Sequence, residues 1–400
     1  MWKKHPTGKR TGRGEQGARS HFTPYSFLQE RVKSMKFRVD SKEMTAALLS
    51  VIKAMPLRTT MPSLEGIFLD ARADGLHLKC SDLMLQKECI VAAVVEEEGQ
   101  AIMPGKLLTE IVRKLPESEA EFRIEGKQVD IACGRVKTSI QSLEFEEFPE
   151  MRFLGDSFTI TLDREECRDL ILKTVFATAQ DDSKPILTGA FIELSDTLTA
   201  VATDAYQFAL RRLPLKTPVK PCSMIVPGKS LLEIARMMDE TEEDVALTFT
   251  RTHVKVDLGH TCLTARLLDG NYIQYGSLLP KEYATRALVN REELIRSIDR
   301  AQLMAREGGN NIIMRFHEGK LTINANSYVG KIDEEIDVQI IGEDMEIAFN
   351  PKYCLNVLKS IDDETVYMDM LTGISPCVVR PVQGDAYLYL IVPVRIYSQF

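Results

Sequence analysis

The sequence predicts an α+β protein of three tandem units of about 120 residues each, within the usual size of a domain. A chain of 400 residues, 44% of them hydrophobic, is too long for one ordinary core. One pattern of helix-start signals also recurs three times along the chain, and such recurrence indicates internal repeats. Between these signals, segments of helical periodicity give way to segments of strand-like alternation.

Each unit is expected to begin with an amphipathic helix. Cap-like residues stand at spacings of 122 and 127, at Ser41, Asp163 and Asn290. Asp163 and Asn290 each precede a glutamate by three residues, which is the spacing of a capping box. Apolar residues such as Leu294 and Ile298 follow at helical spacing. The expected first helices span 41–54, 163–175 and 290–306.

Strands and a second helix are expected next in each unit. The expected strand pairs are 64–70 with 76–80, 187–193 with 198–202, and 312–318 with 321–325. A proline opens each second helix, where its missing N–H costs nothing. The expected second helices span 105–114, 228–238 and 351–360, and further strands such as 122–124, 129–132, 245–249 and 254–258 close the units.

The phase of the repeat sets the domain boundaries. We expect domains over 35–155, 156–284 and 285–400, preceded by an extension over 1–34. This extension has eight basic and two acidic residues, net +6, with the low periodicity typical of disorder. Two interpretations stay open: a basic arm that touches DNA, or a leader upstream of a second start-like residue, Met35.

Charge is segregated in the rest of the chain. After residue 34, 42 basic and 56 acidic residues give a net charge of −14. The six expected helices run against this trend, with 16 Lys/Arg and 10 Asp/Glu. Each has a cation in its first turn, where the helix dipole disfavours positive charge by about 0.3–1 kcal/mol. Each second helix has another cation seven residues on, nearly two turns away and on the same face.

A recurring feature that opposes local stability indicates a functional surface. Rows of exposed cations would bind a polyanion through its phosphates, in a salt-sensitive and sequence-independent way. The alternative is that they are solubilising surface residues. The candidate DNA-binding residues are Lys42, Arg58, Lys106, Arg113, Arg164, Arg168, Lys229, Arg236, Arg291, Lys352 and Lys359.

Several function classes find no support in the sequence. There is no P-loop or GxSxG motif, so neither nucleotide binding nor a serine nucleophile is expected. The eight cysteines form no CxxC pair and the six histidines no metal-binding spacing, so we expect reduced cytoplasmic thiols and no metal or other cofactor. Acidic clusters such as 96–98 and 362–364 are expected in loops, as solvated charge. No apolar run approaches the ~18–20 residues of a membrane span.

Five local strings resemble bacterial DNA polymerase sliding clamps, the beta subunits of DNA polymerase III. Residues 184–189 (KPILTG) followed by 198–204 (LTAVATD) are similar to the middle-domain signature of that family, and 225–233 (IVPGKSLLE) to a helix entry of the same domain. Residues 268–272 (LDGNY) and 389–395 (YLIVPVR) resemble a later loop and the C-terminal segment. The resemblance covers about residues 35–396, in order and in phase.

The resemblance implies three tandem clamp domains and a head-to-tail homodimer that closes a ring, with helices lining the hole and sheets outside. It implies an accessory subunit of a DNA-directed DNA polymerase, without a catalytic site. A separate ATP-driven clamp loader would place it on duplex DNA, where it would hold the polymerase alpha subunit, repair polymerases and mismatch-repair factors. The implied dimer contacts are Leu303 and Met304 on one edge, and the strand around Ile140 on the other.

The resemblance also implies a partner-binding pocket between the middle and C-terminal domains. By position it would use Leu187, Thr203, Ala205, Tyr206, Gln207, Phe208, Ile273, Leu278, Leu390, Val392, Pro393, Val394 and Arg395. The sequence departs from the common family pattern at 205–207 and 272–275, which puts its peptide preference in question. These departures leave open a specialised variant clamp serving a restricted partner. The acidic clusters separately leave open a metal-dependent nuclease or polymerase.

Overall fold

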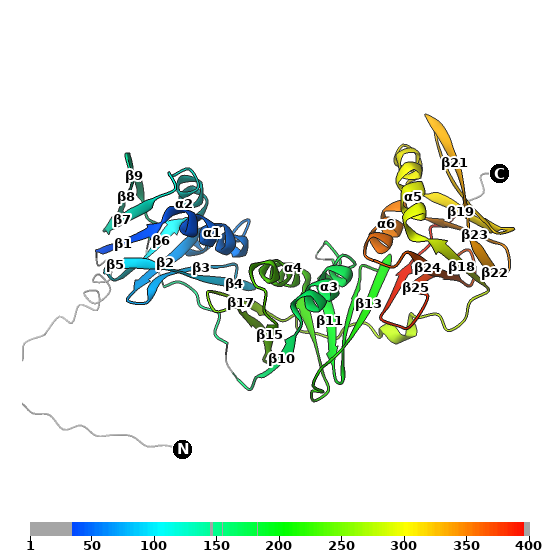
Figure 1. Ribbon diagram of the computed structural model, residues 1–400, viewed down its shortest axis with the longest axis horizontal. Helices are drawn as coiled ribbons and strands as arrows, with labels where there is room; N and C mark the ends of the chain where they lie inside the picture. The colour runs from blue at the N-terminus through cyan, green and yellow to red at the C-terminus, as the bar shows by residue number, and fades with distance from the viewer. Residues whose placement is uncertain (1–33, 145–146, 154, 182, 396–400) are drawn as a thin grey trace, which may run out of the picture.

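The computed structural model describes residues 34–144, 147–153, 155–181 and 183–395. The predictions made for residues 1–33 and 396–400 lie outside this range. Three α+β units follow one another along an arc, as Figure 1 shows, with paired helices on the concave side and sheets on the outer side. The architecture confirms the predicted fold class of three tandem mixed units.

The first unit contains two helices and nine strands. These are β1 (Met35–Asp40), α1 (Ser41–Val51), β2 (Gly66–Arg72), β3 (Gly75–Ser81), β4 (Leu85–Val91), β5 (Ala93–Glu97), β6 (Gly99–Pro104), α2 (Gly105–Val112), β7 (Glu119–Glu125), β8 (Gln128–Cys133) and β9 (Val136–Gln141).

The second unit repeats the two helices. Its elements are β10 (Phe158–Leu162), α3 (Arg164–Val175), β11 (Gly189–Leu194), β12 (Thr197–Thr203), β13 (Gln207–Pro214), β14 (Cys222–Pro227), α4 (Gly228–Met237), β15 (Val245–Phe249), β16 (His253–Asp257) and β17 (Thr261–Arg266).

The third unit repeats them again. Its elements are β18 (Thr285–Asn290), α5 (Arg291–Arg306), β19 (Ile312–His317), β20 (Lys320–Ser327), β21 (Gly330–Asp337), β22 (Gln339–Gly342), β23 (Met345–Phe349), α6 (Pro351–Lys359), β24 (Thr365–Met370), β25 (Cys377–Pro381) and β26 (Tyr387–Ile391).

Two sheets run across the unit boundaries and join the units. An eight-stranded sheet contains β6, β2, β3 and β4 of the first unit, and β4 pairs antiparallel with β17 of the second. A nine-stranded sheet joins the second and third units through the pairing of β13 with β26. A five-stranded sheet with β9 at one edge and a four-stranded sheet with β21 at one edge stand at the two ends of the arc. Within the described chain, both ends of the arc therefore carry a strand that could pair further.

The helices begin close to the predicted positions, with one wrong cap. Asp163 and Asn290 cap α3 and α5 as predicted, each accepting the backbone N–H three residues on at 3.0 Å. The cap of α1 is Asp40 rather than Ser41, since the Asp40 carboxylate accepts from the N–H groups of the second and third residues after it. Ser41 is buried instead, and its hydroxyl donates to the carbonyl of Pro116 at 2.7 Å. A carboxylate binds a positive helix terminus better than a hydroxyl does.

Two predicted strands start too early. Leu64 and Leu187 lie in 3-10 turns, η2 (Pro62–Glu65) and η3 (Pro185–Thr188), which end where β2 and β11 begin. A proline at the first turn fixes φ near the helical value, which favours the turn over a strand. The acidic run at 96–98 was also misplaced, because Glu96 lies in β5 and pairs with Lys36 and Arg38 of β1.

Candidate nucleic-acid and partner interfaces

The concave face presents helix N-termini with uncompensated positive charge. Lys106, Lys229 and Lys352 stand in the first turns of α2, α4 and α6, and all three are exposed. None of these three lysines has an ion pair within the described chain, and none of the three first turns contains an acidic residue. The lysine charge therefore adds to the helix dipole, which attracts phosphate and other anions.

The first helices of the units differ from the second ones. Acidic residues share the first turns of α1, α3 and α5 with the predicted cations Lys42, Arg164 and Arg291. Arg164 lies 3.1 Å from Glu165, and Arg291 donates to the carbonyl of Asp363 at 2.9 Å. The net side-chain charge in these first turns is therefore less positive than in the second helices. Lys42 is nevertheless exposed and has no ion pair in the described residues.

Most of the remaining predicted cations have acidic neighbours that the sequence analysis did not foresee. Arg113 contacts Glu110 at 2.8 Å and Arg168 contacts Asp239 at 2.9 Å. Arg236 pairs with Glu233, and Lys359 lies 3.4 Å from Asp299. Arg58 is the exception, since it is exposed and has no ion pair in the described parts of the chain. Exposed pairs of this kind are weak, at about 0–1 kcal/mol. The unpaired lysines are therefore the stronger candidates for phosphate contacts.

Changing Lys106, Lys229 and Lys352 together to glutamate is expected to impair DNA binding and leave the fold intact. Exposed substitutions usually change stability by less than about 0.5 kcal/mol, and an acid near a helix N-terminus is favoured. Loss of three phosphate contacts would make the negative slope of log Kobs against log salt shallower, by about 2.7. Fluorescence anisotropy on duplex DNA over a salt series measures this slope.

The matched control changes three exposed lysines outside the helices, Lys127, Lys220 and Lys281, to glutamate. It makes the same change in net charge and should alter the slope much less. Equal slopes in the two triple variants would show that the helix lysines do not face DNA.

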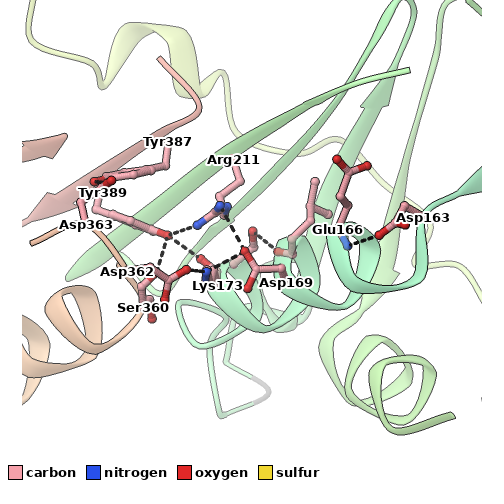
Figure 2. Close-up of polar contacts among 12 residues, drawn as sticks. Asp163, Glu166, Asp169, Lys173, Arg211, Ser360, Asp362, Asp363, Tyr387 and Tyr389 are labelled. Carbon is pink, nitrogen blue, oxygen red and sulfur yellow. Dashed lines mark hydrogen bonds and ion pairs between the residues drawn. The ribbon is translucent and has the colours of Figure 1, made fainter. Parts of the chain in front are cut away.

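Polar contacts join the second and third units on their helix side, as Figure 2 shows. Lys173 of α3 contacts Asp169 at 2.6 Å and also Asp362 in the loop after α6. Arg211 of β13 lies 3.4 Å both from Asp169 and from the hydroxyl of Tyr389. The Tyr389 hydroxyl donates to the carbonyl of Lys173 at 3.0 Å, and burial raises the pKa of Tyr389 to about 12. The tyrosine thus stays a neutral donor at physiological pH.

Two of the predicted partner-binding residues, Phe208 and Leu390, lie on the neighbouring strands β13 and β26. Phe208 and Leu390 are register partners, both buried in a small apolar cluster with Val201, Leu210 and Val378. Tyr206, Ile273 and Leu278 are exposed by 58%, 37% and 45%. Tyr272, Tyr275 and Leu279, which neighbour Ile273 and Leu278 in the sequence, pack against this cluster. We call Tyr206, Ile273 and Leu278, together with the Phe208–Leu390 cluster, the 2–3 junction surface.

The structure places other predicted pocket residues inside the molecule. Leu187 is buried in η3, and the buried Thr203 hydroxyl donates to the carbonyl of Gln207 at 2.7 Å. Gln207 is buried too, donating to the carbonyl of Phe176 and accepting from Asn356 of α6 at 3.1 Å. Gln207 therefore links the second unit to the third rather than lining a surface.

The remaining predicted positions shape the edge of this surface. Ala205 has φ 78°, and Val392 donates its N–H to the carbonyl of Tyr206 at 2.9 Å. Pro393 and Val394 are half-buried and Arg395 is exposed. The sequence analysis missed Tyr353 of α6, whose ring stacks on that of Tyr206 with centroids 5.7 Å apart. Helical periodicity marks Tyr353 only as partly exposed, so no sequence signal connects it with residue 206.

The predicted dimer-contact residues lie at opposite ends of the arc. Ile140 is half-buried on β9, whereas Leu303 on α5 is 56% exposed, with Met304 beside it half-buried. Two exposed residues that the sequence analysis missed, Tyr328 and Val329, occupy the turn between β20 and β21. Both ends thus expose apolar side chains next to an unpaired strand edge.

The described residues contain no cluster of three or more His, Cys, Asp or Glu side chains suited to a metal ion. All eight cysteines are free, and burial raises the pKa of Cys80 and Cys167 to about 12, so these two are unreactive thiols. No helix in the described part of the chain is long and apolar enough to cross a membrane.

Three repeated α+β units, helices on a concave basic face and sheets outside together define a DNA-clamp architecture. Models of the DNA polymerase III beta subunit match the chain in three successive parts: the N-terminal domain at 35–152, the central domain at 161–274 and the C-terminal domain at 276–395. The chain therefore belongs to the DNA polymerase III beta subunit family, the bacterial sliding clamps.

Individual relatives agree with this assignment. The chain is 32% identical to the beta sliding clamp of Bacillus subtilis (strain 168) over 379 residues, covering 91% of this chain and 100% of the relative. The beta sliding clamp of Halalkalibacterium halodurans is 31% identical with the same coverage. The crystal structure of the DNA polymerase sliding clamp from Bacillus subtilis superposes with a TM-score of 0.87 at 31% identity, covering 91% of this chain and all of that one.

Proposed function

We propose that two copies of this chain close head to tail into a ring that encircles duplex DNA and holds the replicative polymerase on it. As a member of the sliding-clamp family the protein is a processivity factor for DNA polymerase III, an accessory subunit rather than a catalyst. The observation that carries the ring is the pair of unpaired strand edges, β9 and β21, at the two ends of an arc with its basic helices inside. Head-to-tail contacts close into a ring when the rotation fits.

Charge complementarity supports the pairing of β9 with β21 of a second copy. Lys137 on β9 and Asp333 on β21 are both exposed, and neither has an ion pair within the described ranges. Exposed apolar residues accompany both edges, with Val136 40% exposed at one end and Leu303 at the other. In this arrangement Ile140 of one copy meets Leu303 and Met304 of the other. The domain boundaries at 155/156 and 284/285 remain part of this proposal.

The partners follow from the same assignment. We propose that the 2–3 junction surface binds short peptide segments of the polymerase alpha subunit, of the clamp loader, and of repair polymerases and mismatch-repair factors in the cytoplasm. A related clamp from Pseudomonas aeruginosa, 27% identical with a TM-score of 0.83, has been crystallised bound to griselimycin. The structure of a Caulobacter crescentus clamp contains polyethylene glycol at a putative beta-motif tethering region. Ligand binding by relatives supports a ligand-binding surface here.

One observation favours a specialised variant as a second candidate. Tyr206 of the 2–3 junction surface stacks on Tyr353, and Gln207 is buried as a link between units. A clamp shaped in this way would accept a narrower set of peptides. Competition between peptides from several partners would separate the two candidates, since a general clamp binds them with similar affinities.

Retention on circular DNA tests the ring. Once loaded onto a nicked circle, the protein is expected to stay bound through gel filtration at a salt concentration that abolishes direct binding. Cutting the circle once should release it, because a ring slides off a free end. Equal retention on circular and linear DNA would contradict encirclement, and a single-chain mass at micromolar concentration would contradict the dimer.

A further inference from the structure

The turn that supports the 2–3 junction surface is repeated between the first and second units. Asp204 accepts from the backbone N–H groups of the second and third residues after it at 2.8 and 2.9 Å. Asp82 does the same at 2.9 and 2.7 Å. The residue after each aspartate has a left-handed backbone, with φ 78° at Ala205 and 70° at Leu83. A non-glycine residue at positive φ is uncommon, so its presence in both turns indicates that they are the same structural motif.

The strand contact beside each turn is repeated as well. Val392 donates its N–H to the carbonyl of Tyr206 at 2.9 Å, where the third unit joins the second. Arg266 donates its backbone N–H to the carbonyl of Met84 at 2.8 Å, where the second unit joins the first. Met84 and Tyr206 therefore hold equivalent positions, two residues after the turn aspartate.

The strand that begins beside each turn also starts in the same way, with a closely packed glycine. A Cβ at Gly66 would lie 2.3 Å from Ile102 Cγ2, and one at Gly189 would lie 2.7 Å from Ile225 Cγ2. A side chain at either position would force its neighbours to shift, which favours glycine there. A pair of stacked aromatic rings follows in each case: Phe68 on Phe148 with centroids 5.3 Å apart, and Phe191 on Tyr272 at 5.2 Å.

The side chains on top of the two scaffolds differ. Leu83 and Met84 are 42% and 39% exposed where the other junction has Ala205 and Tyr206. We call Leu83 and Met84, with the flanking Arg266, the 1–2 junction surface. Arg266 takes the place of the apolar Val392, and it is exposed without an ion pair in the described chain.

A second arginine adds to the positive edge of this surface. The residue after Arg266 donates its backbone N–H to the carbonyl of Thr252 at 2.8 Å, so the backbone at Arg251 lies close to the backbone at Arg266. Arg251 is also exposed and has no ion pair among residues that the structure describes. The nearby Asp82 carboxylate is engaged by the turn. The 1–2 junction surface thus has an apolar centre and a cationic edge.

We propose that the 1–2 junction surface is a second docking site, for a short protein segment that combines apolar side chains with Asp or Glu. The proposal rests on the proposed function, because it takes the 2–3 junction surface to be a peptide-binding site whose backbone arrangement the 1–2 junction repeats. Charge complementarity selects the occupant, since exposed arginines steer acidic segments and repel basic ones. The N-terminal extension of this chain carries net +6 and is excluded on that ground. A few apolar anchors would carry most of the affinity.

The test uses a phage-displayed random dodecapeptide library selected on the full-length protein with the 2–3 junction surface disabled by Tyr206→Ser and Ile273→Ser. Selection should enrich peptides that contain apolar residues together with Asp or Glu. Synthetic copies of these peptides should lose about tenfold or more of their affinity when Met84→Ser or Arg266→Glu is added. Their binding should also weaken with salt, because the arginines are exposed.

The matched comparison separates this proposal from the function of the other junction. Met84→Ser and Arg266→Glu alone should leave binding of a polymerase peptide to the 2–3 junction surface unchanged, and circular dichroism should show an intact fold. Failure of enrichment would overturn the second site, and so would enrichment of basic peptides or of peptides that match this chain's own sequence. Enriched peptides whose affinity is unchanged by both substitutions would overturn it too. None of these results would affect the 2–3 junction surface, whose own test is polymerase-peptide binding.

Discussion

Replacing Ile273 and Leu278 with serine is expected to lower the affinity for a polymerase peptide by about 100-fold, or about 2.8 kcal/mol. The two side chains are 37% and 45% exposed, next in sequence to residues that pack on the buried Phe208–Leu390 cluster, so they can provide anchors without supporting the fold. A titration of the labelled C-terminal peptide of the polymerase alpha subunit, followed by anisotropy, measures the change. Stimulation of primer extension should fall in parallel, while the mass of the assembly stays the same.

The control for this pair is Ile341→Ser. Ile341 is 64% exposed on β22, at the far edge of the nine-stranded sheet from β14. The Ile341→Ser substitution removes an equivalent apolar side chain and should leave peptide binding unchanged. Unaltered affinity in the Ile273/Leu278 variant would place the partner site elsewhere.

A deletion of residues 390–400 would not test the same point. Leu390 and Ile391 are 3% and 1% exposed, and they belong to β26, the strand that joins the third unit to β13. Removing them breaks the pairing between units and leaves buried backbone groups without partners, which costs about 1–3 kcal/mol each. The ring itself would then be at risk, so point substitutions of exposed residues separate binding from assembly.

Changing Leu303 and Val329 to aspartate is expected to convert the proposed dimer into single chains at micromolar concentration. The two side chains are 56% and 57% exposed at the β21 end of the arc, where the proposed contact would bury them. Burying a carboxylate without a partner is strongly unfavourable. The dissociation constant should rise by about 100-fold or more. Sedimentation velocity over a dilution series measures it.

Leu49→Asp provides the matched control for assembly. Leu49 is 41% exposed on α1, which belongs to neither edge strand, and the substitution puts the same kind of charge at an exposed leucine. This variant should keep the mass of the parent protein. A dimer that survives both end substitutions would show that the chains associate through another surface.

The sequence by itself determined the threefold repeat, the six helices and the first-turn cations. These features depend on local physics: side-chain periodicity decides which face of a helix is buried, and a capping carboxylate or a proline decides where it begins. Asp163 and Asn290 were therefore recognised as caps directly, and Lys106, Lys229 and Lys352 were placed correctly in first turns. Even the one wrong cap, Ser41 for Asp40, was an error of a single residue.

Only the tertiary structure decided which strands meet and which charges are neutralised. The pairing of β4 with β17 joins residues more than 170 apart in the sequence, as in the contact of Cys89 with Thr261, and no local signal encodes such a register. The stacking of Tyr206 on Tyr353 and the burial of Gln207 depend on how the third unit docks on the second. Hydrophobic burial favours any arrangement that covers apolar surface, whereas register and ion pairing depend on the one arrangement that also satisfies the backbone hydrogen bonds.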